Sequence, residues 1–130
     1  MTRINVGILP AELPSKLLLA EHREIKRIPN NVRLGKVNFK DIPSKFTLGA
    51  GHVKFFYNKL GYLKDRYEKI YDECIARGFN IQSYHESFEG IPLKLMGEYI
   101  ETFSDRELLI DRITSKRIHN WKIQYQTNIY

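Results

Sequence analysis

The chain has 130 residues, of which 42% are hydrophobic, so it can fold as one domain with a modest core and is not a disordered tail. A formal net charge of +6 favours a polyanionic partner, with nucleic acid as the first candidate and an acidic membrane surface as the second. One cysteine excludes an intramolecular disulfide, and neither a signal peptide nor a run of membrane-spanning length is present, which predicts a cytoplasmic protein.

The first predicted helix runs from about Pro14 to Ile28 and ends at Pro29, because proline followed by two asparagines is typical of a turn. On a helical wheel, one side is apolar and a cationic edge lies beside it. The apolar side holds Leu13, Leu17, Ala20, Ile25 and Ile28. The cationic edge holds Lys16, Arg23 and Arg27. Glu24 falls on the apolar side next to this edge, which is an expensive place for an unpaired carboxylate.

Two further helices are predicted. The second runs from about Ala50 to Gly78, where the glycine would cap its carboxyl end. The third runs from Ser104 to about His119, because Ser104 and Glu107 have the spacing of a capping box.

The connections between these helices are rich in glycine, proline and asparagine, and no segment shows the alternation of a strand. Cys74 falls in the apolar register of the second helix and is expected in the core. The sequence therefore predicts an all-α fold, with residues 1–130 forming a single compact domain of three main helices and long irregular connections.

Two carboxylates on the first helix compete for a structural and a functional role. Glu24 could form a buried salt bridge that holds the helix to its neighbours, and Glu21 lies on the same side and could do the same. Alternatively, Glu24 lies in a partly dry site, where a carboxylate stabilises a developing cation or moves protons. Helix geometry alone favours structural pairing and leaves both interpretations open.

The cationic residues suggest a nucleic-acid surface. Lys16, Arg23 and Arg27 share one ridge, which can follow backbone phosphates or can be an ordinary solvated helix face. Arg112 and Lys116 would add a second ridge if the first and third helices pack side by side. Near the end of the chain, Trp121 and Tyr125 lie among polar and cationic residues. Aromatic rings there can stack on bases, or Trp121 can instead close the core.

The amino terminus reads Met1-Thr2-Arg3, and a small second residue permits removal of the initiator methionine. The chain would then begin with the α-amine of Thr2, whose pKa of roughly 7.7 to 8.0 lies well below that of lysine. Roughly a tenth of such an amine is neutral at pH 7 and is available for Schiff-base chemistry. Many proteins begin with the same two residues, so this motif alone does not identify an enzyme.

Several blocks stand in order along nearly the whole chain. They are Met1–Asn5, Ala20–Glu24 with Arg27, Phe46–Val53, Phe55–Tyr57, Lys59–Leu60, Glu73–Cys74, Arg77–Asn80 and Tyr99–Ile100. Together they resemble the phage-type pyrimidine-dimer DNA glycosylases, the endonuclease V family. Such a series of blocks is far more specific than any single short motif in the chain.

The resemblance implies a mainly helical fold whose amino-terminal segment threads between helices to reach the site. It implies a glycosylase with AP lyase activity on cyclobutane pyrimidine dimers in duplex DNA. In that family pattern, the Thr2 α-amine attacks the anomeric carbon of the dimer's 5′ nucleotide and forms an imine. Glu24 stabilises the cationic intermediate and assists β-elimination, which leaves Glu21 as the structural carboxylate. We expect a monomer that needs no metal and no organic cofactor.

The resemblance also implies that the duplex is kinked and that a base opposite the lesion is flipped out, which is cheaper at a poorly stacked step. The residues expected to contact DNA are Arg3, Lys16, Arg23, Arg27, Arg112, Lys116, Trp121 and Tyr125. Two alternatives stay open. One is a non-catalytic basic DNA-binding protein on the same scaffold, and the other is a glycosylase/lyase for abasic sites or other damaged bases.

Overall fold

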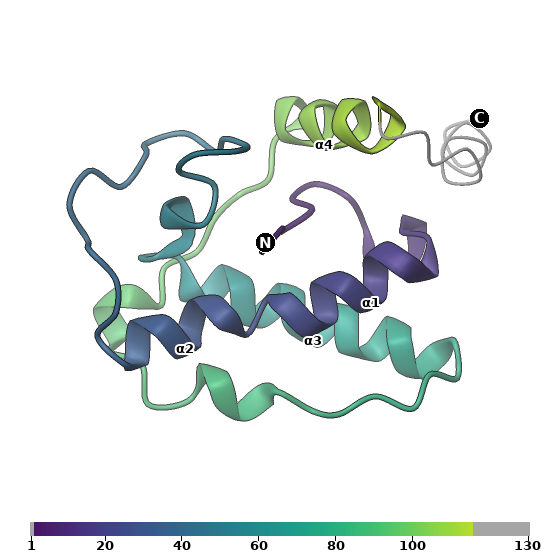
Figure 1. The fold of residues 1–130 in the computed structure, drawn as a ribbon, viewed down its shortest axis with the longest axis horizontal. Helices are drawn as coiled ribbons and strands as arrows, with labels where there is room; N and C mark the ends of the chain where they lie inside the picture. Colours follow the sequence, from purple (N-terminus) through teal and green to yellow (C-terminus); the bar gives the residue numbers. More distant parts are fainter. Residues whose placement is uncertain (1, 116–130) are drawn as a thin grey trace.

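The computed structural model describes residues 2–115 (Figure 1). The α-helices are α1 (Ser15–Glu24), α2 (Arg27–Arg33), α3 (Leu60–Ala76) and α4 (Phe103–Ser115). Short 3-10 helices are η1 (Pro10–Glu12), η2 (Lys54–Phe56), η3 (His85–Phe88) and η4 (Leu93–Leu95). No strand is present within residues 2–115, where only one isolated bridge pairs two residues, so the predicted all-α fold is confirmed.

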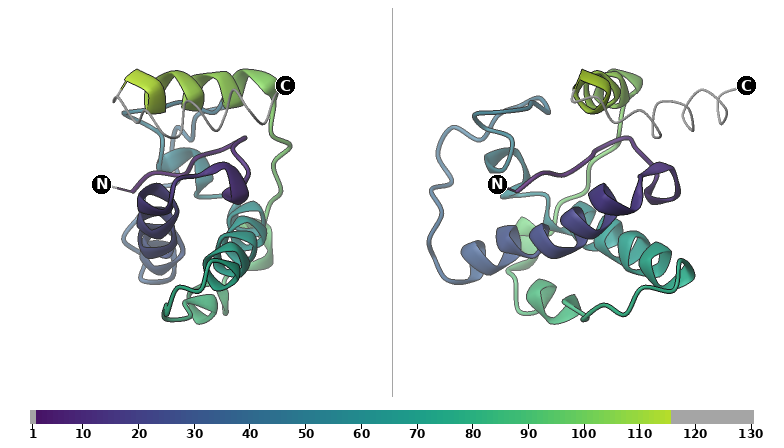
Figure 2. Two further views of the ribbon diagram at one scale, coloured as in Figure 1. Left: turned by 90° about the vertical axis from the view of Figure 1, so that its right-hand side faces the viewer. Right: turned by 45° about the vertical axis from the view of Figure 1, so that its right-hand side comes forward.

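The amino-terminal segment, residues 2–9, runs through the middle of the molecule (Figures 1 and 2). On one side of it α1 packs against α3, and on the other side lies α4. Ile4, Val6 and Ile8 from this segment are at most 1% exposed. Burial of each stabilises the extended path by roughly 1.5–3 kcal/mol. The expectation that the amino terminus threads between helices is therefore confirmed.

The first predicted helix does not end at Pro29, so that prediction is wrong. α1 ends at Glu24, and after Ile25 and Lys26, whose backbones stay right-handed helical, α2 continues to Arg33. Pro29 is the third residue of α2, where a backbone N–H would have no acceptor within the helix. Proline is therefore tolerated at this position, and the two asparagines that follow it are helical.

The start of α3 also differs from the prediction, whereas its end agrees. The helix begins at Leu60 and not near Ala50. Gly49 and Gly51 have φ values of 69° and 88°, which a continuous helix excludes, so the chain turns before η2. Gly78 has a φ of 82° directly after the last helical turn, and the predicted carboxyl-terminal cap is confirmed.

The capping box of α4 is formed by Thr102 and Asp105, not by Ser104 and Glu107. The Asp105 N–H donates to Thr102 Oγ1 at 3.1 Å, and the Thr102 N–H donates to the Asp105 carboxylate at 3.0 Å. The two pairs have the same spacing, so the local pattern does not choose between them. Asp105 is buried and also accepts from the Tyr99 hydroxyl, and this tertiary contact favours the earlier register.

Candidate DNA-processing site

Side chains from distant parts of the chain hold the amino-terminal segment in place. The Ile4 N–H donates to His52 Nε2 at 2.9 Å, and the Gly7 N–H donates to the Glu101 carboxylate at 2.9 Å. These acceptors lie in the turn before η2 and in the segment before α4. The backbone near the amino terminus is therefore positioned by tertiary contacts and not by a helix or sheet of its own.

The partners of His52 determine its tautomer. A backbone N–H can only donate, so Nε2 accepts from Ile4, and Nδ1 carries the proton and donates to the Thr47 carbonyl at 2.9 Å. Burial lowers the pKa of His52; the Thr47 carbonyl opposes this shift, and the nearby cations of Arg112 and Arg3 add to it. The neutral ring is thus the form that fits this position.

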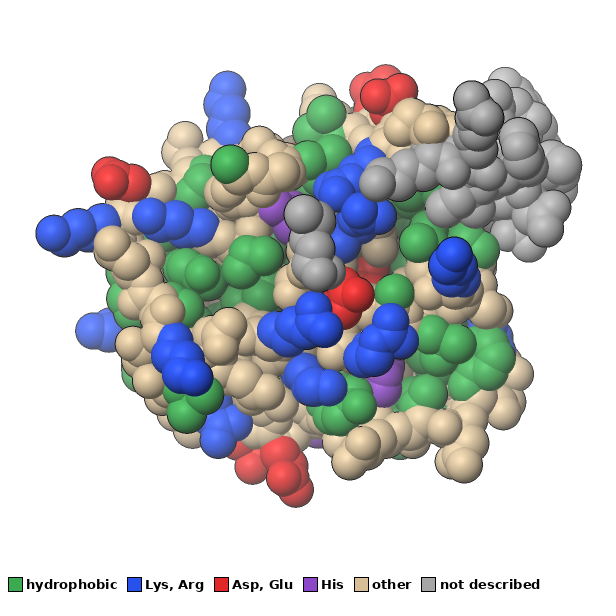
Figure 3. Space-filling model, in the orientation of Figure 1, with side chains coloured by type: hydrophobic (Ala, Val, Ile, Leu, Met, Phe, Trp, Pro, Cys, Tyr) green, Lys and Arg blue, Asp and Glu red, His purple; other side chains and the backbone are tan. Residues whose placement is uncertain are grey.

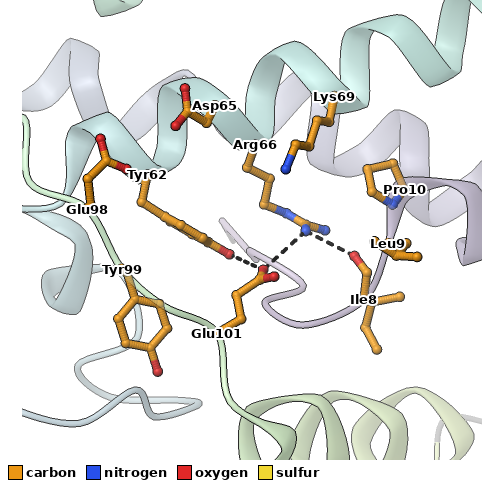
Figure 4. A pocket seen from close by; sticks show the side chains of 10 residues that line it. All are labelled: Ile8, Leu9, Pro10, Tyr62, Asp65, Arg66, Lys69, Glu98, Tyr99 and Glu101. Atoms are coloured by element: carbon orange, nitrogen blue, oxygen red, sulfur yellow. Dashed lines mark hydrogen bonds and ion pairs between the residues drawn. The ribbon is translucent and has the colours of Figure 1, made fainter.

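Glu21 is the buried and paired carboxylate of α1. It is 1% exposed, forms an ion pair with Arg66 from α3, and accepts from Asn5 Nδ2 at 2.7 Å. Arg66 also donates to the Ile8 carbonyl at 3.0 Å, and Figure 4 shows it between this carbonyl and Glu101. The pair therefore joins α1, α3 and the amino-terminal segment, and its polar groups are satisfied as a buried ion pair requires.

Glu24 has different surroundings, although it follows on the same helix. It is partly exposed, and its carboxylate has no ion pair or hydrogen bond with any residue in 2–115. It lines a cleft of about 160 Å³ whose other lining residues are Arg3, Asn5, Leu17, Ala20 and Glu21. Arg3 Nε and Asn5 Oδ1 are buried there without a hydrogen-bond partner among the described residues. Unsatisfied polar groups around an unpaired carboxylate are typical of a functional site.

Thr2 lines a second cleft, of about 360 Å³, together with His52, Tyr57 and Arg112 among others. Thr2 and Arg3 are consecutive residues that line different clefts, so the two clefts are neighbours across the amino-terminal backbone. Burial and the charge of Arg3 both lower the pKa of the Arg112 guanidinium, which indicates that these cations lie close together. The structure thus brings four predicted site residues into one region: Thr2, Arg3, Glu24 and Arg112.

The predicted cationic ridge is exposed. Lys16 and Arg23 lie on the surface of α1, and Arg27 lies at the start of α2. Lys and Arg side chains gather over these helices on the face seen in Figure 3, with an acidic group among them. None of the three forms an ion pair with another described residue. A group of unneutralised cations beside a cleft favours binding of a polyanion.

Three predicted contacts, Lys116, Trp121 and Tyr125, lie outside the described residues, as does the predicted helix end near His119. Within residues 2–115, no group of three or more His, Cys, Asp or Glu side chains could hold a metal ion. The same part of the chain contains no helix that is both long and apolar enough to cross a membrane.

Asn5, His52 and Arg66 build the site but were not among the predicted site residues. Asn5 and Arg66 meet Glu21 across 16 and 45 positions, and His52 meets Ile4 across 48. One signal was present for Arg66, because it interrupts the apolar stripe of α3 and so indicates a buried cation that needs a carboxylate.

A comparison with protein families gives one match that covers this region. The family model described as pyrimidine dimer DNA glycosylase matches residues 1–87. This range is more than half of the 130-residue chain and contains the amino-terminal segment, α1, the turn before η2 and all of α3. The resemblance found from the sequence blocks is confirmed. The chain belongs to the pyrimidine dimer DNA glycosylase family and is accordingly a DNA repair glycosylase for DNA that contains pyrimidine dimers.

Proposed function

We propose that the enzyme is a bifunctional glycosylase and AP lyase that acts on cyclobutane pyrimidine dimers, with the Thr2 α-amine as nucleophile and Glu24 as the catalytic carboxylate. The proposal rests on one contrast within α1. The Glu24 carboxylate has no partner within residues 2–115 and lies in a cleft next to that of Thr2, whereas Glu21 is buried and paired. Amine and carboxylate supply the chemistry, so the mechanism of this monomer needs no metal and no organic cofactor.

The reaction begins after removal of Met1, when the neutral Thr2 amine attacks C1′ of the dimer's 5′ nucleotide. A C1′–N bond forms and the glycosidic bond breaks, and its electron pair leaves with the base, which takes up a proton. The sugar ring then opens: the nitrogen lone pair forms the C1′=N bond of an iminium ion, and the C1′–O4′ bonding pair moves onto O4′, which takes a proton from solvent and becomes a hydroxyl. Glu24 stabilises this cation, because a carboxylate in a partly water-excluded cleft interacts strongly with developing positive charge.

Strand cleavage follows from the same intermediate. Removal of a proton from C2′, assisted by Glu24, forms a C2′–C3′ double bond, and the C3′–O bond breaks with its electron pair leaving on the phosphate oxygen. Water then hydrolyses the imine and frees the Thr2 amine. The cations beside the clefts bind the phosphates of a kinked duplex in which a base opposite the lesion is flipped out. They are the exposed Lys16, Arg23 and Arg27 and the partly buried Arg3 and Arg112. Lys116, Trp121 and Tyr125 add contacts in this proposal.

The decisive experiment is borohydride reduction in the presence of ultraviolet-irradiated duplex. A covalent protein–DNA adduct should form, and peptide mass spectrometry should place it on the Thr2 amine. Protein that retains Met1, or whose amine is acetylated, should form none. Parallel duplexes with an abasic site or an oxidised base separate dimer chemistry from action on other lesions. Absence of an adduct from folded protein of confirmed processed mass would contradict the proposal.

A further inference from the structure

The anchor nearest to the proposed nucleophile is the hydrogen bond from Ile4 to His52. The backbones of Thr2 and Arg3 form no hydrogen bond with another described residue. Two residues beyond Thr2, the Ile4 N–H donates to His52 Nε2 at 2.9 Å, and both residues are buried. This hydrogen bond is therefore the backbone anchor from which residues 2 and 3 extend into the cleft.

His52 is itself held rigidly, so it can serve as a fixed point. Its Nδ1–H donates to the Thr47 carbonyl at 2.9 Å, within the same turn before η2. Its ring packs edge-on against Phe46 and Phe56, with centroid distances of 5.4 and 5.5 Å. Because His52 is only 4% exposed, neither ring nitrogen exchanges its protein partner for water without local movement. The ring lines the same cleft as Thr2.

We infer that His52 is the positioning residue for the amine: its neutral Nε2 holds the Ile4 backbone and thereby fixes where the Thr2 α-amine stands relative to the damaged nucleotide. This role rests on the proposed function of Thr2. A misplacement of about 1 Å costs on the order of a hundredfold in rate when reacting groups must be held in near-attack geometry. Loss of the anchor therefore reduces the rate of imine formation more than it reduces duplex binding.

Protonation of His52 breaks the anchor. A proton on Nε2 turns the acceptor into a donor that faces the Ile4 N–H, and two donors cannot share a hydrogen bond. The charges that act on the ring are those of Arg3, Glu21 and Arg112, from the amino-terminal segment, α1 and α4. Lys54 at the start of η2 and Tyr57 directly after η2 line the same cleft as His52. Glu21 already forms an ion pair with Arg66. The charges of Arg112 and Arg3 therefore outweigh that of Glu21 at His52 and disfavour its protonated ring.

The inference gives a distinctive pH profile for imine formation, measured as the initial rate of borohydride trapping. Below the amine pKa of roughly 7.7 to 8.0, the logarithm of the rate should fall with a slope of about 1, because only the neutral amine attacks. Once His52 also binds a proton, below its ordinary value of about 6.5, the slope should steepen to about 2.

Two variants distinguish anchoring from packing. In His52→Gln the amide oxygen supplies an acceptor that does not titrate, so trapping at neutral pH should stay within about threefold of wild type and the steeper slope should vanish. His52→Phe keeps the ring contacts but leaves the Ile4 N–H without an acceptor, so trapping should fall by about tenfold or more. If His52 acts only by packing, the trapping rate of His52→Phe should equal or exceed that of His52→Gln, and this order of rates would overturn the inference. Retention of the steep slope in His52→Gln would also overturn it.

Controls separate this inference from the proposed function. His85→Gln replaces a histidine away from the amino terminus and should retain the steep slope. Thermal midpoints and binding of undamaged duplex should be similar in wild type and in His52→Gln. If His52→Phe does not fold, the pH profile of trapping in His52→Gln still tests the inference. A second test is the NMR coupling across the Ile4 N–H···Nε2 hydrogen bond in the wild-type protein. Absence of this coupling would contradict the anchor. A wild-type enzyme that traps no DNA contradicts the Thr2 chemistry, whereas normal trapping with equal Gln and Phe variants contradicts only the role of His52.

Discussion

Two carboxylates of α1, Glu21 and Glu24, line the same cleft, but their surroundings differ. Glu21, on the more deeply buried side of the cleft, is 1% exposed and forms an ion pair with Arg66. Glu24 is partly exposed near the exposed Arg23 and Arg27, and no described residue pairs with it. Removal of a charge from water costs several kcal/mol unless a partner offsets it. The partner, and not the residue type, therefore separates the structural carboxylate from the candidate for catalysis.

The largest effect should come from Glu24→Gln, which keeps the shape of the side chain and removes its charge. Single-turnover cleavage of dimer-containing duplex should fall by about 10²–10⁴-fold, because the cation loses its stabilising carboxylate. The free energy of unfolding should change by less than about 0.5 kcal/mol, because no described partner is lost. Glu68→Gln, an exposed site on α3, serves as the control. Turnover near the wild-type level would assign Glu24 to the same structural class as Glu21.

Arg66→Met should have the opposite profile, with a large loss of stability. It leaves Glu21 buried without its charge partner, and the free energy of unfolding in urea should decrease by about 3–5 kcal/mol. Adding Glu21→Leu should recover part of this loss, because the double variant buries no unpaired charge. A loss of less than about 1 kcal/mol in Arg66→Met would show that the interior pair does not stabilise the fold.

Acidification should weaken the interior through its histidines. Burial lowers the pKa of both His22 and His52, so the unfolded chain binds their protons first as the pH falls below about 6.5. The free energy of unfolding should therefore decrease below that pH, by at most about 1.4 kcal/mol per pH unit for each histidine, and should not depend on them above it. Urea titrations at several pH values test this. Glu24→Gln should keep the slope and His52→Gln should reduce it; an unchanged slope in His52→Gln would contradict the assignment.

The smallest effect is expected at the exposed ridge. Arg23→Ala should reduce the dependence of log affinity on log salt by about 0.9 for undamaged duplex, because one phosphate contact is lost. The free energy of unfolding should stay within about 0.5 kcal/mol of wild type. Lys64→Ala removes the same charge from the exposed surface of α3 and controls for net charge. Equal salt slopes in the two variants would indicate a general charge effect and no defined phosphate contact.

Local sequence patterns predicted the structure well where a pattern is compatible with only one local conformation. Gly78 marks the end of α3 because a left-handed residue there fits only a helix cap. The patterns misled where one signal had two solutions. Pro29 is compatible with a helix end and with the first turn of a new helix, and the capping spacing occurs at both Thr102 and Ser104. Burial of Asp105 selected between the latter two.

Side-chain periodicity and the order of residue blocks were sufficient to establish the all-α class, the cationic edge of α1 and α2, and the family. These properties depend on residues that are close together in the sequence. Periodicity alone could not distinguish the roles of Glu21 and Glu24, which only the family resemblance separated, and neither source identified the anchor of the amino terminus. Those depend on contacts from Arg66 and His52 to partners 45 and 48 positions away. A hydrogen bond between groups so distant in the chain produces no periodic pattern in the sequence, because it forms only when the helices pack.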